Sequence, residues 1–161
     1  MPDYKRIATE EAFATRDQIA QFRKRLADGY DDPGFLSLWG FYLNSPSERA
    51  RFIVERLQDL GPDRIADMDA AGIDMQVLSL TSPGVQVFDA ATANSLAASA
   101  NDELAEAIRR YPTRYAGLAA AAPQDPKAAA VLAEYPQVRW AEITRRALKI
   151  GLGYLKGGAK D

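Results

Sequence analysis

Three segments repeat apolar residues every three or four positions, the spacing of an amphipathic helix. They cover 46–60, 62–71 and 92–110. The first of these helices has a clear predicted start. Ser45 is its predicted N-cap, Pro46 its first helical residue, and Glu48 the reciprocal capping partner of Ser45. Glycines follow the first two segments and a proline follows the third, so the ends of the predicted helices are also marked.

Three other apolar runs have the length and composition of strands. The first begins at Ile7, the second covers 73–80, and the third covers 115–122. They alternate with the predicted helices, and this order is typical of βαβ units with a parallel sheet. The sequence therefore predicts an α/β fold.

Residues 16–44 show no sustained period. Ile19, Phe22 and Leu26 predict one short helix, which ends near Gly29. A dense apolar cluster follows between residues 35 and 43. Its members form part of the core, a subunit interface, or the wall of a substrate site.

Composition bounds the chemistry of the chain. Its 161 residues, 47% of them hydrophobic, are enough for a globular domain with a core. The formal net charge of −2 gives no reason to expect nucleic acid as a partner. No apolar run is long enough to span a membrane, and no signal peptide pattern is present, so we expect a cytoplasmic protein.

The sequence contains no cysteine and no histidine. This excludes disulfides, thiolate sites, imidazole-bound metal and histidine-based triads within these residues. Any chemistry must rest on carboxylates, amines, guanidinium groups or hydroxyls. Glu10 and Glu11 are candidates, because they follow the first apolar run. Side chains alternate along a strand, so only one of the pair is expected to face a site, as a metal ligand or general base. The alternative is that both are solvated.

Four further side chains are candidates for substrate binding, each with a structural alternative. Trp39 and Tyr42 lie in the apolar cluster and suit an aromatic ligand or the core. Arg64 can bind a carboxylate through two hydrogen bonds, or pair with Asp67. Ser79 is near the end of the second predicted strand, where it can bind a ligand or satisfy the backbone of a turn.

Several segments also resemble a known family, in a fixed order between about residues 5 and 130. They are Ile7–Phe13, Arg64–Asp69, Gly72–Asp74, Val77–Gln86, Asn101–Ala105 and Ala121–Pro126. Together they are similar to the N-terminal part of the amidohydrolase-superfamily metal-dependent decarboxylases, of the gamma-resorcylate and 5-carboxyvanillate type. The resemblance implies that Glu10 is the first-strand metal ligand. Ala12 matches a position that is His in many relatives.

The resemblance implies a (β/α)8 TIM-type barrel, which needs about 250 residues. This sequence has room for roughly three of the eight units, so we expect an incomplete barrel in a chain that looks truncated. We expect residues 1–130 to form the partial barrel, with a lid-like insertion at 16–44. Residues 131–161 diverge from the family; from Arg139 onward they carry six basic and two acidic residues.

The implied function is metal-dependent, non-oxidative decarboxylation of a hydroxylated aromatic carboxylate. The cofactor is then a divalent ion (Zn or Mn), or none in this chain, and the partners are a small aromatic acid and further copies in a homo-oligomer. Two alternatives stay open: an amidohydrolase-type hydrolase, and a non-catalytic fragment or interaction module. The family's histidine ligands have no counterpart here.

Overall fold

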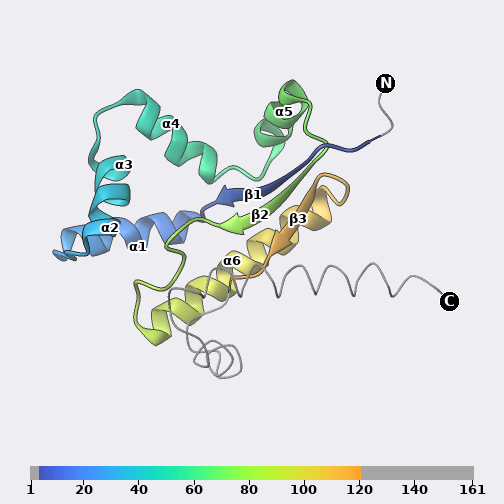
Figure 1. Ribbon diagram of the computed structural model, residues 1–161. Helices are drawn as coiled ribbons and strands as arrows, with labels where there is room; N and C mark the ends of the chain where they lie inside the picture. Colours follow the sequence, from blue (N-terminus) through green and yellow to red (C-terminus); the bar gives the residue numbers. More distant parts are fainter. Residues whose placement is uncertain (1–3, 121–161) are drawn as a thin grey trace, which may run out of the picture. The chain divides into compact units, whose positions relative to one another are not determined.

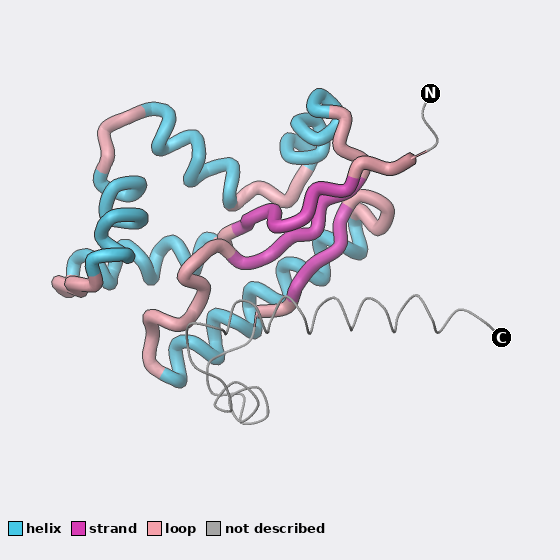
Figure 2. Tube along the Cα trace, in the orientation of Figure 1, coloured by secondary structure: helices cyan, strands magenta, loops and turns pink. Residues whose placement is uncertain are grey.

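A computed structural model describes residues 4–120, which form a three-stranded parallel sheet with helices around it (Figure 1). The strands are β1 (Ile7–Phe13), β2 (Met75–Leu80) and β3 (Tyr115–Leu118). They lie side by side in sequence order, with β2 in the centre (Figure 2). The sheet is open within the described residues. This confirms the predicted α/β fold and parallel sheet, and it fits a partial barrel.

Helical segments connect the strands. They are α1 (Arg16–Ala27), α2 (Pro33–Phe35), the π-helical η1 (Leu36–Gly40), α3 (Phe41–Asn44), α4 (Glu48–Leu57), α5 (Pro62–Ala71) and α6 (Ala90–Arg110). Helix α5 has the predicted bounds, and Gly72 ends it in the left-handed conformation at φ 67°. Helix α6 begins two residues before the prediction, because the Asp89 side chain accepts hydrogen bonds from Ala91 N and Thr92 N.

The predicted start of α4 at Ser45 was wrong. The helix begins at Glu48, because Ser47 keeps an extended backbone at ψ 129°. The Ser45 hydroxyl accepts a hydrogen bond from Ser47 N at 3.2 Å, so it stabilises the turn before the helix rather than the helix itself.

Residues 16–44 contain more regular structure than their pattern predicts. The expected helix is present as α1, and α2, η1 and α3 then follow without a break from residue 33 to residue 44. Phe22, Phe35 and Trp39 form the buried centre of this segment, each at most 2% exposed. Ring centroids lie 5.2 Å apart for the first two and 4.8 Å apart for Phe22 and Trp39. Aromatic packing between the helices therefore stabilises the fold of this segment.

The main core lies on one face of the sheet. Phe13, Leu78 and Tyr115 come from the three strands and pack against Met68 of α5 and Leu104 of α6. The opposite face is less well covered. Alternate residues there are only partly buried: Ala12, Val77, Ser79, Ala116 and Leu118. In a closed barrel that second face is the interior. The prediction of a third strand over 115–122 was too long, because β3 ends at Leu118 and residues 119 and 120 are not in a strand. The segment 131–161 lies outside the described residues.

Tyr115 gives this core a specific pH dependence. Its side chain is 1% exposed, and its hydroxyl finds no hydrogen-bond partner within residues 4–120. Burial raises the pKa of Tyr115 to about 12. The folded state thus holds the proton more tightly than the unfolded chain, and this contribution to stability is present below pH 10 and lost as the pH rises toward 12.

We expect Tyr115→Phe to remove this alkaline loss in unfolding free energy, which is about 1.4 kcal/mol at pH 11, one unit above the ordinary tyrosine pKa and one unit below that of Tyr115. At neutral pH the substitution should be close to neutral or stabilising, because it deletes a buried, unpaired hydroxyl. Urea unfolding at pH 8 and pH 11 measures both effects, and Tyr4→Phe, at a ring 64% exposed, is the matched control. An unchanged pH dependence in Tyr115→Phe would contradict the assignment.

Candidate functional site

Glu10 lies at an irregularity in the middle of β1. Ala8 pairs with Gln76 and Glu11 pairs with Leu78, so β1 has one residue more than β2 over this stretch. Such a β-bulge twists a strand and redirects its side chains. Glu10 has a φ of 72°, and it is the single non-glycine residue with positive φ in the described part of the chain. For a residue with a Cβ this conformation is strained, and strain of this kind often marks functional positions.

The bulge corrects two expectations about the acidic pair. The strand continues to Phe13, so Glu10 is not at its carboxyl end. The regular alternation that should separate Glu10 from Glu11 is interrupted between Ala8 and Glu11. The Glu10 side chain is exposed, whereas Glu11 is partly buried and lies near the guanidinium of Arg64, with Oε2 3.9 Å from Nη2. The two carboxylates therefore have different surroundings.

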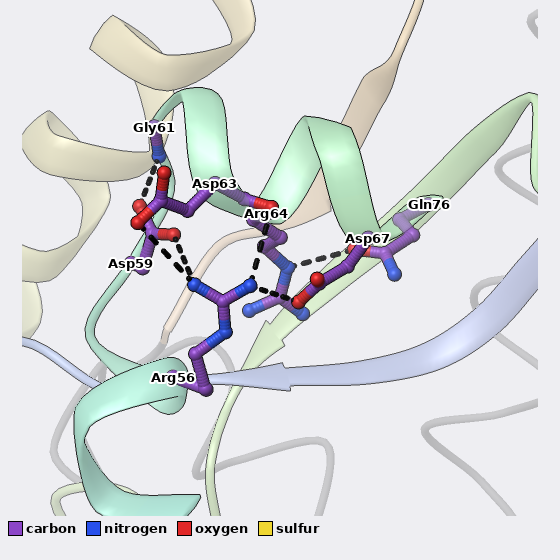
Figure 3. A network of polar contacts seen from close by, with 7 residues as sticks. All are labelled: Arg56, Asp59, Gly61, Asp63, Arg64, Asp67 and Gln76. Carbon is purple, nitrogen blue, oxygen red and sulfur yellow. Dashed lines mark hydrogen bonds and ion pairs between the residues drawn. The ribbon is translucent and has the colours of Figure 1, made fainter. Parts of the chain in front are cut away.

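Arg64 is held inside the protein by three groups. Its Nε donates to Gln76 Oε1 at 2.8 Å, and its Nη2 donates to the carbonyl of Ala12 at 3.0 Å. The third group is Glu11, which also accepts a 3.4 Å hydrogen bond from Gln76 Nε2. Only 11% of the Arg64 side chain is exposed, and burial lowers the pKa of its guanidinium. Figure 3 shows the Arg64–Gln76 bond between α5 and β2.

Asp67, the neighbour expected to pair with Arg64, pairs with Arg56 instead. Arg56 also lies 3.4 Å from Asp59 and 3.5 Å from Asp63, so three carboxylates surround one guanidinium (Figure 3). The hydrogen bond from Arg56 to Asp67 is the main reason that its pKa is raised. The expected Arg64–Asp67 pair was therefore wrong: α4 supplies a more exposed arginine that reaches the aspartate.

Trp39 is placed in the core, at 2% exposure, rather than on an open surface. Its indole Nε1 donates to the carbonyl of Ser82 at 2.9 Å, in the turn that follows β2. Gln18 of α1, 1% exposed, reaches the same turn through 3.5 Å and 3.3 Å hydrogen bonds from its Nε2 to Thr81 O and Gly84 O. Three carbonyls of residues 81–84 are thus fixed by the segment 16–44, which contacts this loop as a packed wall.

Tyr42 and Ser79 are the two remaining predicted residues. Tyr42 is partly buried, and its ring centroid lies 6.4 Å from that of Trp39. Ser79 is partly buried and lies on β2, where it pairs with Ala12 of β1, two residues after Glu10. The structure thus brings Glu10 and Ser79 onto adjacent strands, whereas Trp39 and Arg64 are engaged by internal partners.

Gln18 and Gln76 are important polar residues that the sequence analysis did not single out, although each carried a signal. Gln18 precedes Phe22 by four residues, which places both on one face of α1. Gln76 precedes Leu78 by two, which places both on the buried face of β2. A polar residue in a position that the period marks as buried indicates a specific hydrogen-bonding role.

The described residues do not make a metal site by themselves. Between residues 4 and 120 no group of three or more metal-binding side chains (His, Cys, Asp or Glu) comes together. A single exposed carboxylate such as Glu10 holds a divalent ion poorly, since such ions need several ligands in a defined geometry. Over the same residues, no helix combines the length and the apolar character needed to cross a membrane.

Comparisons with known proteins agree on one group of enzymes. No family model matches the sequence. Among curated proteins, the gamma-resorcylate decarboxylase of Polaromonas sp. is 36% identical over 126 residues, and that of Rhizobium radiobacter is 34% identical over 125. These matches cover 78% and 77% of this chain, but 33% and 32% of the relatives. The chain therefore spans about a third of the length of the curated relatives it matches.

Solved structures that resemble this chain include members of the same group of decarboxylases. A 5-carboxyvanillate decarboxylase from Novosphingobium aromaticivorans, complexed with manganese and 4-hydroxy-3-methoxy-5-nitrobenzoic acid, is 58% identical with a TM-score of 0.73. The match covers 77% of this chain and 36% of that one. A 2,6-dihydroxybenzoate decarboxylase from Rhizobium is 30% identical with a TM-score of 0.58, over 76% of this chain and 32% of that one.

The open parallel sheet with its crossover helices thus corresponds to part of an α/β barrel of the TIM type. The homologues of this chain are decarboxylases of the amidohydrolase superfamily. Over about the N-terminal 77% of its length it is homologous to gamma-resorcylate and 5-carboxyvanillate decarboxylases, which confirms the resemblance seen in the sequence. Structures of these homologues contain manganese, so a divalent metal ion is a cofactor within the family.

Proposed function

We propose that this chain forms the N-terminal part of a metal-dependent, non-oxidative decarboxylase of a hydroxylated aromatic carboxylate. The observation that carries the proposal is the similarity to the Novosphingobium enzyme, 58% identical over 77% of this chain. The local structure supports it, because the residue matching the family's first-strand ligand, Glu10, is exposed on a strained bulge. In this proposal residues 1–130 are the partial barrel, and 131–161 form a separate segment.

The reaction breaks the bond between the ring and its carboxylate. The bonding electrons remain on the ring carbon, CO₂ leaves, and an acid delivers a proton to that carbon. We propose that Glu10 supplies one carboxylate ligand to a site whose other ligands lie outside the described residues. Ser79 and Tyr42 remain our candidates for contact with the aromatic acid. For Trp39 we propose that it supports the loop at residues 81–84 from within the core.

A second candidate is a non-catalytic interaction module. The complete absence of histidine favours it, because the family's metal site also takes histidine from later strands. Self-association is part of both proposals. Large apolar side chains are exposed on η1, α3 and α4, and burying them between copies would be favourable. They are Leu36, Phe41 and Phe52, at 43%, 58% and 57% exposure.

A chimera tests the decarboxylase proposal directly. Residues 4–120 of this chain would replace the matching segment of the Novosphingobium enzyme, which supplies the remaining barrel strands. We expect the chimera to decarboxylate 5-carboxyvanillate in the presence of Mn²⁺, because the grafted segment carries Glu10 and the loop after β2 on a fold similar to that of this enzyme, with a TM-score of 0.73. The full chain, assayed beside it, should be inactive alone. A chimera that folds cooperatively and binds Mn²⁺ but shows no turnover would contradict the proposal.

A further inference from the structure

Building on the proposed function, we propose that Arg64 is a positioning residue that holds the bulge of β1 and thereby sets the orientation of Glu10. The guanidinium touches the two residues that follow Glu10 in the chain. Its Nη2 donates to the carbonyl of Ala12 and lies 3.9 Å from the carboxylate of Glu11. The residue therefore acts on Glu10 through the backbone of β1, not by contact with a substrate.

The hydrogen bond to Ala12 occupies a carbonyl that the sheet leaves open. The neighbouring carbonyl of Phe13 accepts from Thr81 N at 2.7 Å, and so points toward the segment that follows β2. Successive carbonyls of a strand point to opposite sides, so the carbonyl of Ala12 points away from β2. Within residues 4–120 no strand pairs with that edge of β1. Arg64 supplies the donor that this edge lacks.

The bulge needs such a support. A non-glycine residue at positive φ is strained and persists only where its surroundings enforce it. Before the bulge, Arg6 N donates to Asp74 Oδ2 at 2.7 Å, which fixes the start of β1 to the start of β2. After the bulge, Arg64 fixes Ala12 at 3.0 Å. Glu10 is thus held between two anchors, on its amino-terminal and carboxyl-terminal sides.

Arg64 is itself oriented for this role. Gln76 accepts from its Nε at 2.8 Å, and the rigid, planar guanidinium then directs Nη2 toward β1. Gln76 also donates to Glu11, so the glutamine, the carboxylate and the guanidinium form one closed set of contacts. A lysine at this position keeps the charge but cannot bind Gln76 and Ala12 together in the same fixed geometry.

Arg56 provides a matched comparison within the same region. It is 27% exposed, and its ionic partners Asp59, Asp63 and Asp67 belong to α5 and the segment that connects α4 to it. Among the described residues, no hydrogen bond or ion pair joins Arg56 to β1. Replacing Arg56 therefore removes a guanidinium network of similar size without touching the bulge.

Nuclear magnetic resonance on the full chain tests the proposal. The backbone chemical shifts of Glu10 report its positive φ, and thermal unfolding of the same samples reports global stability. We expect Arg64→Lys and Arg64→Met to shift the Glu10 signals toward those of an extended strand. We expect Arg56→Lys to leave these signals unchanged, even where it lowers the melting temperature by a similar amount. A purely structural role of Arg64 would change stability alone.

Two results would overturn the proposal. The first is folded Arg64 variants whose Glu10 shifts match those of the unsubstituted chain. The second is failure of both variants to fold, which would assign Arg64 to global stability rather than to the bulge. The measurement needs neither metal nor turnover, so it is independent of the chimera experiment. Shifted Glu10 signals in the Arg64 variants, beside a chimera that folds and binds Mn²⁺ without turnover, would leave the positioning role standing and reject the decarboxylase.

Discussion

Glu10→Gln in the chimera is expected to lower kcat/KM for 5-carboxyvanillate by roughly 100-fold or more, since even a residue that only supports a metal ligand contributes 10- to 100-fold. Glutamine keeps the size of the side chain and removes the negative charge that a divalent cation requires. The bulge at φ 72° should persist, because its hydrogen bonds involve other residues. Steady-state kinetics at saturating Mn²⁺ measure the effect.

The control for this substitution is Glu55→Gln, at an exposed position of α4. It makes the same chemical change away from β1, and kcat/KM should stay near the value of the unsubstituted chimera. Equal activities of the Glu10 and Glu55 variants would show that Glu10 is not a ligand and that the likeness of β1 to the family's first strand is only structural.

Trp39→Ala is expected to destabilise the full chain by about 3–5 kcal/mol, the usual cost of deleting a large buried aromatic side chain. The indole is 2% exposed and packs against Phe22, with 4.8 Å between ring centroids. The substitution also leaves the carbonyl of Ser82 without its donor. Urea unfolding followed by circular dichroism at neutral pH measures the loss.

Trp39→Phe separates packing from hydrogen bonding. It keeps most of the buried ring and removes the Nε1–H donor, so the expected loss is about 1–2 kcal/mol. If Trp39→Ala cost no more than this variant, the indole would not be part of the core. Such a result would place Trp39 at the surface, as expected of a residue that contacts substrate.

Local patterns were sufficient to predict the elements that are stabilised by local interactions. The bounds of α5 follow from Pro62 and Gly72, which begin and end a helix for steric reasons. The order of strands and helices follows from apolar spacing, and it correctly indicated a parallel sheet. Similarity to the homologous enzymes then identified this sheet as part of a barrel. The spacing of apolar residues alone could not show this.

Features that depend on tertiary contacts were not predictable from the pattern. The bulge at Glu10 depends on pairing with β2, which the sequence of β1 does not encode by itself. The helices between residues 33 and 44 are stabilised by the burial of Phe35 and Trp39, so propensity and period gave no signal. The partner of Arg64 was mistaken because Gln76 and Ala12 are distant in sequence.

Calorimetric titration of Mn²⁺ into the full chain, the chimera and the Glu10→Gln chimera tests the central claim most directly. The claim is that this chain contributes one carboxylate to a metal site completed by later barrel strands. We predict measurable binding to the chimera, a large loss of affinity in the Glu10→Gln variant, and no binding to the full chain at the same concentrations. Two results would contradict the account: Mn²⁺ binding that is equally tight in both chimeras, or tight Mn²⁺ binding to the full chain by itself.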